Sequence, residues 1–275
     1  MTTGSWTSVR VRSPTNRADI IRVLFALGAE GVQELDDDII THIRDLDRSH
    51  ARVSLERADG AARVEFGETP TVDWSAKWRT RITAHRLGRL VVTPPWLAEQ
   101  FTPQERIVID PGMAFGTGEH ETTRGVLRLM QPVICADDVV ADLGAGSAVL
   151  AIGAAKLGAR RAIAIELDPD AIGNAEANVL ANGVADRVSL IEGDVFVLLP
   201  LVAPVRVILA NIISSVLVEL LPVAKEALAA SGVAILSGLL MTERAEMAEA
   251  FEREGWNVVA TDEEGMWWSA TIVPR

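Results

Sequence analysis

The sequence predicts an α/β protein: a doubly wound parallel sheet with an antiparallel hairpin at its C-terminal edge, preceded by a small α+β domain. From residue 136 onward, buried-strand patterns alternate with helix patterns, an order typical of parallel sheets. The last two strand patterns, "GWNVVATDE" and "MWWSATIV", follow one another without an intervening helix, which indicates an antiparallel pair. The first 70 residues lack this alternation and are charged and turn-rich.

The amino-acid composition of the chain excludes or disfavours several classes of protein. The 275 residues are 49% hydrophobic, enough for a large and a small domain. Acidic residues outnumber basic ones by 38 to 26, and a net charge of -12 disfavours direct nucleic-acid binding. Cys135 is the single cysteine, the N-terminus lacks the apolar core of a signal peptide, and the longest apolar region, residues 207–221, is too polar to span a bilayer. We expect a cytoplasmic monomer without membrane contact.

Residues 1–70 are predicted to form the small α+β domain. "WTSVRVRS" alternates like a strand, and "RADIIRVLFALGAEG" predicts an amphipathic helix that ends at Gly28. "HARVSLERA" and "AARVEFGE" are interpreted as short alternating pieces. Residues 71–98 follow as a basic linker, with five basic residues against Asp73; it is either a solvated connector or a docking surface for anions.

In the larger domain, residues 99–275, the sequence predicts the following strands and helices in chain order. "DVVADLG" and "RRAIAIEL" are strands separated by an all-apolar helix, "SAVLAIGAAKLG". "DPDAIGNAEANVLANG" predicts a helix with Ile172, Ala175 and Val179 on its buried face. Two further strands, "RVSLIEGD" and "VRVILANI", precede the helix of "SSVLVELLPVAKEALAAS" and the strand "GVAILSG".

Polar or glycine residues follow four of these strands, where doubly wound sheets bind ligands. Gly144 and Gly146 follow the first strand, where they either approach a ligand or serve packing, and Ser147 could cap the next helix. Glu166 ends the second strand at a spacing suited to the hydroxyls of a ribose.

The third and fourth strands end in an acid and an amide. Asp194 could meet an adenine amino group, although Gly193-Asp194 is also an ordinary turn. Asn211 interrupts an apolar run and needs hydrogen-bond partners, either in a ligand or within the fold.

Three other kinds of site are disfavoured. A dinucleotide loop needs a third glycine where Val149 stands, and a phosphate loop of the form G-x-x-x-x-G-K-[ST] is absent. His120-Glu121 begins like H-E-x-x-H, but Arg124 replaces the second histidine, so no metal site is expected.

The strand-end residues together resemble the Rossmann-like S-adenosylmethionine-dependent methyltransferases. The motifs "DPGMAFGTGEHETTR", "DWSAKW", "GAGSAVLAIGAAKLGA", "ELDPDAIGNAEANVLANGV", "ANII" and "LSGLL" resemble, in order, those of the PrmA family, which methylates the eleventh protein of the large ribosomal subunit. The resemblance covers residues 72–275. It implies an N-terminal substrate-recognition domain, a linker and a methyltransferase domain, with S-adenosylmethionine as cofactor and that ribosomal protein as substrate.

The resemblance also implies cofactor contacts at Thr123, Gly144, Glu166 and Asn211. Within "DPGMAFGTGEHETTR" we expect Phe115 to Gly118 to be a loop that folds over the cofactor as a lid, with contacts from Phe115 and Thr117. The following "HETTRGVLRLM" predicts a helix whose start presents Thr122 and Thr123, and His120 is expected to be structural. Three positions depart from the usual family pattern: Ala148 replaces a glycine, Glu166 replaces an aspartate, and "ANIIS" stands where a leucine often follows the asparagine and its neighbour.

The expected chemistry is attack of a neutral amine on the sulfonium methyl group. A lysine amine, and in addition an N-terminal α-amine, would be oriented by Asn211, because no general base is evident. Two alternatives remain open at this point. The substrate could be another protein, such as the electron-transfer flavoprotein β subunit, or the chain could bind S-adenosylmethionine without turnover.

Overall fold

The structure is a computed structural model that describes residues 6–12, 15–29, 32–35, 38–68, 82–110 and 118–275. The chain divides into two compact units, Met1–Thr80 and Arg81–Arg275. Each unit has its own hydrophobic core, and we describe them separately.

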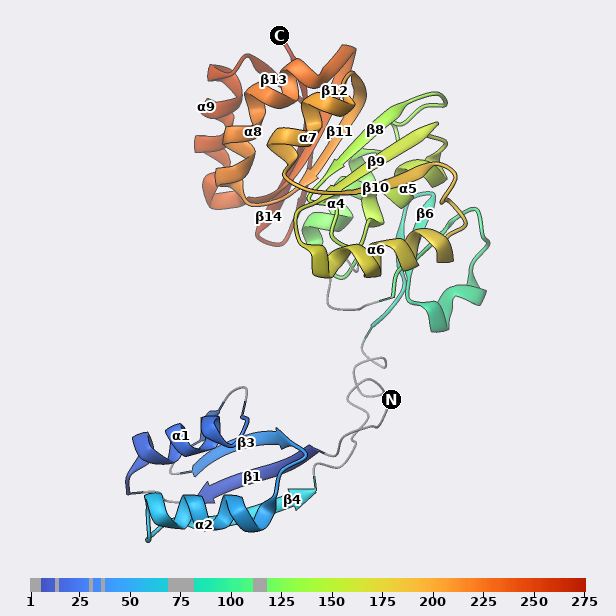
Figure 1. The fold of residues 1–275 in the computed structure, drawn as a ribbon. Coiled ribbons are helices and arrows are strands. Elements are labelled where there is room, and N and C mark those ends of the chain that lie inside the picture. The colour runs from blue at the N-terminus through green and yellow to red at the C-terminus, as the bar shows by residue number, and fades with distance from the viewer. Residues whose placement is uncertain (1–5, 13–14, 30–31, 36–37, 69–81, 111–117) are drawn as a thin grey trace. The chain divides into compact units, whose positions relative to one another are not determined.

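The first unit is a four-stranded antiparallel sheet with two helices on one face (Figure 1). Its strands lie in the order β2-β3-β1-β4, the arrangement of a β-α-β-β-α-β motif. Ile20 and Leu24 of one helix and Leu55 of the other are fully buried in a single cluster with the strands, so both helices cover the same face. The elements are β1 (Trp6–Arg12), α1 (Arg17–Ala26), β2 (Gln33–Leu35), β3 (Asp38–Arg44), α2 (Arg48–Ala58) and β4 (Arg63–Glu68).

The prediction of a strand-like piece at "HARVSLERA" was wrong, because this segment is helix α2. The carboxylate of Asp47 caps the helix by accepting the backbone N–H groups of Ser49 and His50. Ala51 and Leu55, one turn apart, are both buried, whereas Val53 is 58% exposed. The helical spacing of the buried pair therefore outweighs the alternation of Val53, Ser54 and Leu55.

The second unit contains the doubly wound sheet that the sequence predicts. Its seven strands lie in the order β10-β9-β8-β11-β12-β14-β13; the first five are mutually parallel, and the last two are antiparallel to their neighbours. The C-terminal hairpin thus forms one edge of the sheet. Its first strand, β13, is outermost, and its second strand, β14, lies between β13 and β12. The strands are β8 (Val139–Leu143), β9 (Arg161–Glu166), β10 (Val188–Glu192), β11 (Val205–Asn211), β12 (Leu228–Leu240), β13 (Trp256–Glu264) and β14 (Trp267–Pro274).

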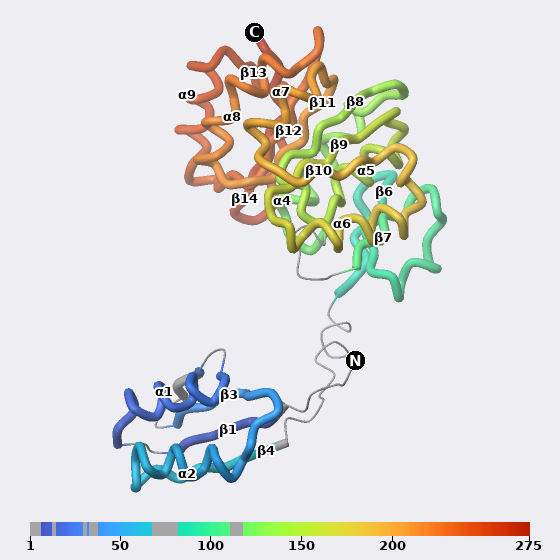
Figure 2. The backbone as a smooth tube through the Cα atoms, viewed as in Figure 1, coloured from blue at the N-terminus to red at the C-terminus, as the bar shows by residue number. Residues whose placement is uncertain are grey.

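Helices cover both faces of this sheet (Figure 2). One face buries its residues against α4 (Glu121–Leu129), α5 (Val149–Leu157) and α6 (Pro169–Ala181). The other buries them against α7 (Val195–Val202), α8 (Ser214–Ala227) and α9 (Arg244–Arg253), which follows the short η2 (Met241–Glu243). On α6 the buried residues include Ala175 and Val179 as expected, but Ala171 and Asn178 instead of Ile172.

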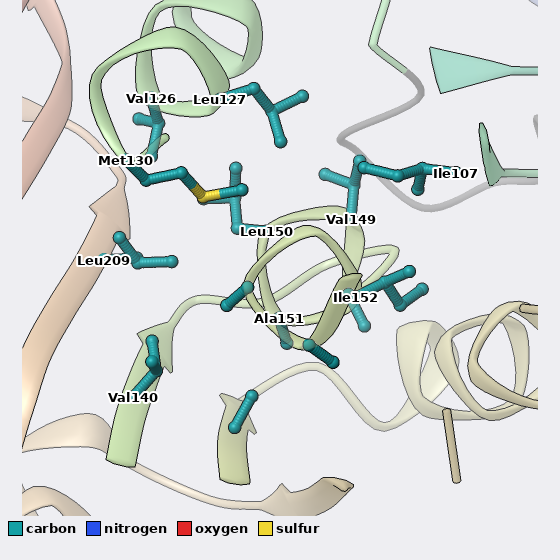
Figure 3. Packing of buried hydrophobic residues seen from close by; sticks show 14 of the residues in the cluster. Ile107, Val126, Leu127, Met130, Val140, Val149, Leu150, Ala151, Ile152 and Leu209 are labelled. Carbon is teal, nitrogen blue, oxygen red and sulfur yellow. The ribbon is translucent and has the colours of Figure 1, made fainter. Parts of the chain in front are cut away.

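Helix α5 is buried all round because it lies between the sheet and α4. Figure 3 shows its side chains between Val140 of the sheet and Met130 and Leu127 at the α4 side. A Cβ atom on Gly153 would lie 2.4 Å from Cε of Met130, so this glycine permits the close approach of the two helices. The tight packing gives α4 a fixed position beside the sheet.

Residues 85–108 belong to the second unit and form a small three-stranded sheet, which includes part of the segment that we interpret as a linker. Its strands are β5 (His85–Leu87), β6 (Leu90–Thr93) and β7 (Arg106–Val108), with the short helix η1 (Pro95–Gln100) between the last two. In the described part of the chain, every helix is too short or too polar to cross a membrane.

Candidate functional site

Three of the sequence-predicted residues meet at one edge of the large sheet. Strands β9, β8 and β11 are neighbours, and Leu143 pairs with Ile165 on one side and Ala210 on the other. The residues that follow these positions, Gly144, Glu166 and Asn211, therefore lie together at the carboxyl ends of adjacent strands. This edge is where open α/β sheets bind their ligands.

A glycine turn and a carboxylate connect the ends of β8 and β9. Gly144 has φ +68° and Gly146 has φ +51°, both in the left-handed region that favours glycine. The backbone N–H of Gly146 donates to Oε2 of Glu166 at 2.7 Å, and Oε1 of Glu166 accepts from the N–H of Asp168 at 2.9 Å. The carboxylate of Glu166 is thus held against the turn.

Helix α5 begins differently from our expectation. The residue at its N-cap is Ala148, which has φ +63° and provides no side-chain hydrogen bond, so Ser147 does not occupy the cap position. An L-residue other than glycine in this region carries a steric cost of about 1–2 kcal/mol.

Asp142, one residue before the end of β8, is a feature that the sequence analysis did not assign. Its side chain is fully buried; Oδ2 accepts the N–H of Ala151 at 2.9 Å, and Oδ1 has no hydrogen-bond partner within the described structure. Burial raises the pKa of Asp142 to about 7, and the charge of Glu166 adds to this effect. The available sequence signal was a carboxylate in the last two residues of a strand that leads into a glycine turn.

Asn211 is joined to Thr123, which lies 88 residues earlier in the chain. The side-chain Nδ2 of Asn211 donates to Oγ1 of Thr123 at 3.2 Å. Thr123 is fully buried in the first turn of α4, whereas Asn211 is half-buried at the end of β11. With its nitrogen engaged, the amide leaves Oδ1 as the group that can accept a hydrogen bond from a ligand.

The first turn of α4 is held by a histidine and by the hairpin of β13 and β14. Nδ1 of His120, the N-cap, accepts the N–H of Thr122 at 3.4 Å, and the His120 ring meets that of Trp267 edge-on at 5.1 Å. Nη2 of Arg124 lies 2.7 Å from a carboxylate oxygen of Glu264, and this pairing contributes most to lowering the pKa of that carboxyl group. These contacts support the structural role expected for His120.

Asp194 follows the end of β10, the strand beside β9, and has a local hydrogen-bond partner. Its Oδ1 accepts the N–H of Phe196 at 2.8 Å and caps α7, which is the ordinary-turn alternative that the sequence left open. The N–H of Gly193 donates to the carbonyl oxygen of Glu166 at 2.8 Å, so the ends of β9 and β10 are adjacent. The exposed carboxylate of Asp194 retains its other oxygen for a ligand.

Phe115 and Thr117 lie outside the described residues, and of the predicted lid loop, Phe115 to Gly118, only Gly118 is described. The backbone on either side is well anchored. The N–H of Asp110 donates to Oδ1 of Asn178 at 3.0 Å, and Gly118, with φ +85°, packs where a Cβ atom would lie 2.6 Å from Cγ1 of Val92. No group of three or more metal-ligating side chains occurs in the portion of the chain that is described.

The carboxyl edge of the large sheet therefore combines a glycine turn, carboxylates and one hydrogen-bonded amide. Glu166 and the buried Asp142 can accept hydrogen bonds from the hydroxyl or amine groups of an organic ligand, and the glycine turn lets such a ligand approach the backbone. Asn211 can orient a second group without exchanging a proton. This set of groups fits a transfer reaction that depends on positioning.

Comparison with known proteins agrees with this geometry. A sequence model of the family described as ribosomal protein L11 methyltransferase (PrmA) matches residues 36–274. The chain is 37% identical over 262 residues to the ribosomal protein L11 methyltransferase of Geobacter sulfurreducens, a match covering 90% of this chain and 85% of that protein. It is 32% identical over 235 residues to the protein of the same name from Clostridium perfringens, covering 84% and 73%.

A solved structure shares the fold. The crystal structure of the ribosomal protein L11 methylase from Lactobacillus delbrueckii subsp. bulgaricus matches with a TM-score of 0.63 and 29% identity, covering 70% of this chain and all of that chain. The family match spans most of the chain, including every described site residue. The chain therefore belongs to the family of ribosomal protein L11 methyltransferases, and S-adenosylmethionine is its cofactor.

Proposed function

We propose that this chain transfers methyl groups from S-adenosylmethionine to ribosomal protein L11, at lysine side chains and at the N-terminal α-amine. The names of the relatives support the substrate. The single structural observation that supports the amine chemistry is the bond from Asn211 to Thr123, because it engages the amide nitrogen and leaves the amide oxygen to accept from an amine.

The residues at the sheet edge fit the proposed cofactor. Oδ1 of the buried Asp142 has no partner and can accept from the ammonium group of the methionine part of the cofactor. Glu166 is placed to accept the ribose hydroxyls, and Asp194 to accept from the adenine amino group. The turn from Gly144 to Gly146 leaves room for the ligand beside the backbone. Phe115 and Thr117 remain proposed contacts.

When bound, S-adenosylmethionine supplies an electrophilic methyl group on a positively charged sulfur. The chain must present a neutral amine to it. At pH 7, deprotonating a lysine with pKa about 10.4 costs about 4–5 kcal/mol, and an α-amine with pKa about 7.8 costs about 1 kcal/mol. Oδ1 of Asn211 accepts an N–H of the amine and directs the nitrogen lone pair toward the methyl group. The proton of the methylated product leaves to solvent.

The two units have different roles in this proposal. Residues 1–70 recognise the protein substrate, and residues 99–275 carry the transfer. Residues 71–98 join these two parts, and their C-terminal portion, with β5 and β6, is folded into the second unit. In this proposal the chain acts as a monomer in the cytoplasm. Its net charge of -12 supports the absence of direct nucleic-acid binding.

A transfer assay tests the proposal. Purified chain is incubated with S-adenosylmethionine labelled in the methyl group and with bacterial ribosomal protein L11, and the labelled amines are identified by mass spectrometry. We expect label on L11 lysines and on its α-amine. A second L11 sample with all lysines replaced by arginine should retain label only at the α-amine.

Two results would refute parts of the proposal. Label on the electron-transfer flavoprotein β subunit, supplied in parallel, with none on L11 would refute the substrate. Cofactor binding by calorimetry without transfer to L11, to that subunit or to any protein of a cell extract would refute turnover and leave a binding module.

A further inference from the structure

Two buried serine hydroxyls lie beneath the first turn of α4. Oγ of Ser237, in β12, donates to the carbonyl oxygen of Thr122 at 3.1 Å and lies 2.7 Å from Oγ of Ser269, in β14. Both side chains are 2% exposed or less. Since Ser237 has one proton and donates it to Thr122, Ser269 is the donor within the pair.

The helix lies unusually close to the strands at this point. A Cβ atom on Gly125 would be 2.3 Å from Oγ of Ser269, so a glycine is required for α4 to reach the pair. The anchored carbonyl of Thr122 belongs to the peptide group that also contains the nitrogen of Thr123. Ser237 is therefore bonded to the peptide group that leads into Thr123.

Ser237 and Asn211 act on the same turn of α4 from neighbouring strands. The two residues are paired in register between β11 and β12, so their side chains leave the same face of the sheet. Asn211 reaches the hydroxyl of Thr123, and Ser237 reaches the carbonyl of Thr122. Two consecutive residues in the first turn of α4 are thus hydrogen-bonded to the sheet, and the two sheet residues that bond them are paired across β11 and β12.

We infer that Ser237 is a positioning residue for methyl transfer: by holding the carbonyl of Thr122, it places Thr123 where it fixes the amide of Asn211. The inference rests on the proposed function for its kinetic readout. A merely structural role would affect stability without acting through Thr123. Kinetic coupling between Ser237 and Thr123 distinguishes the two roles.

A double-mutant cycle provides the test. Ser237→Ala and Thr123→Val are each expected to lower kcat about tenfold at saturating S-adenosylmethionine, the effect of losing about one hydrogen bond. The double variant should be within about twofold of Thr123→Val alone, because both changes release the same amide. Independent, multiplicative losses of about a hundredfold would overturn the inference, as would a wild-type kcat in Ser237→Ala.

Two further variants distinguish loss of the Thr122 contact from a general loss of stability. Ser269→Ala leaves the bond from Ser237 to Thr122 in place and should keep kcat within about threefold of wild type; a loss equal to that of Ser237→Ala would overturn the role of the Thr122 contact. Ser189→Ala, on β10 of the same sheet, is the matched control and should keep wild-type kcat. All variants are compared well below their unfolding temperatures.

A failure of the positioning role of Ser237 can be distinguished from a failure of the proposed function. If the wild-type chain labels a protein other than L11, the proposed substrate is wrong, but the cycle can be run with the protein that is labelled. If the wild type labels L11 and the cycle is additive, the proposed function stands and the positioning role fails.

Discussion

The side-chain amide of Asn211 donates to the hydroxyl of Thr123, at 3.2 Å, across 88 residues of sequence. Both residues are predicted from the sequence as site residues, but their hydrogen bond to one another is visible only in the fold. The bond engages the amide nitrogen of Asn211, which leaves the amide oxygen as the acceptor available to a ligand. Catalysis by positioning depends on such a constraint, because misplacing a reacting group by about 1 Å can lower the rate about 10²-fold.

Asn211→Ala should therefore fold normally and lose transfer. We expect kcat to fall about 10²-fold, because the amine loses the acceptor that aligns it. Steady-state kinetics measure the loss, and thermal unfolding verifies the fold. Asn257→Ala, on the exposed part of β13, is the matched control and should retain wild-type kinetics. Equal rates in Asn211→Ala and wild type would remove Asn211 from the mechanism.

Gly144→Val should abolish cofactor binding. Gly144 has φ +68°, and a Cβ atom there would lie 2.7 Å from Cγ2 of Ile212, so a branched side chain must distort the turn. Calorimetry with S-adenosylmethionine measures the loss. Gly173→Ala, in α6 with open space around the site of its Cβ, is the control and should bind normally while gaining about 0.5–1 kcal/mol of stability. Normal binding by Gly144→Val would place the cofactor elsewhere.

Much of the site could be predicted because a polar residue that ends an apolar strand is visible in a linear sequence. Glu166 and Asn211 are of this kind, the glycine turn at Gly144 is equally visible after its strand, and the parallel topology brings the three to one edge. Contacts that depend on packing leave no such periodic signal. The hydroxyl pair of Ser237 and Ser269 and the partnerless oxygen of Asp142 belong to this second kind.

The same distinction explains the incorrect local predictions. The alternation around Val53 resembles a strand, but packing of Ala51 and Leu55 against the sheet selects a helix. Ser147 is a good capping residue by type, yet the left-handed backbone conformation falls at Ala148 and moves the cap by one position. Dihedral angles at a turn depend on the surrounding packing, which residue types alone do not specify.

Ala148→Gly should stabilise the chain. Ala148 has φ +63°, a conformation that costs an alanine about 1–2 kcal/mol and a glycine almost nothing, while the greater freedom of glycine in the unfolded chain offsets about 0.5–1 kcal/mol. We expect a net gain of about 0.5–1 kcal/mol in the free energy of unfolding by urea. Ala177→Gly, in the exposed middle of α6, should instead lose about 1 kcal/mol. A loss of stability in Ala148→Gly would contradict the assigned strain.

Asp142 should make the stability of the chain depend on pH. Its pKa is raised from 3.8 to about 7 by burial, so the folded state binds this proton more tightly than the unfolded state. The associated stability is present at acidic pH and is lost as pH rises from about 4 to about 7. A difference of about three pKa units corresponds to about 4 kcal/mol.

Asp142→Asn tests this dependence, because the amide can still accept the N–H of Ala151 and does not titrate. The free energy of unfolding of the variant, measured by urea denaturation, should rise relative to wild type by up to about 4 kcal/mol between pH 4 and pH 8. Asp186→Asn, at an exposed carboxylate, is the control and should show no such trend. A difference between Asp142→Asn and wild type that stays constant with pH would mean that Asp142 is ionised in the folded chain at pH 4, and that the buried carboxylate carries its charge despite its missing partner.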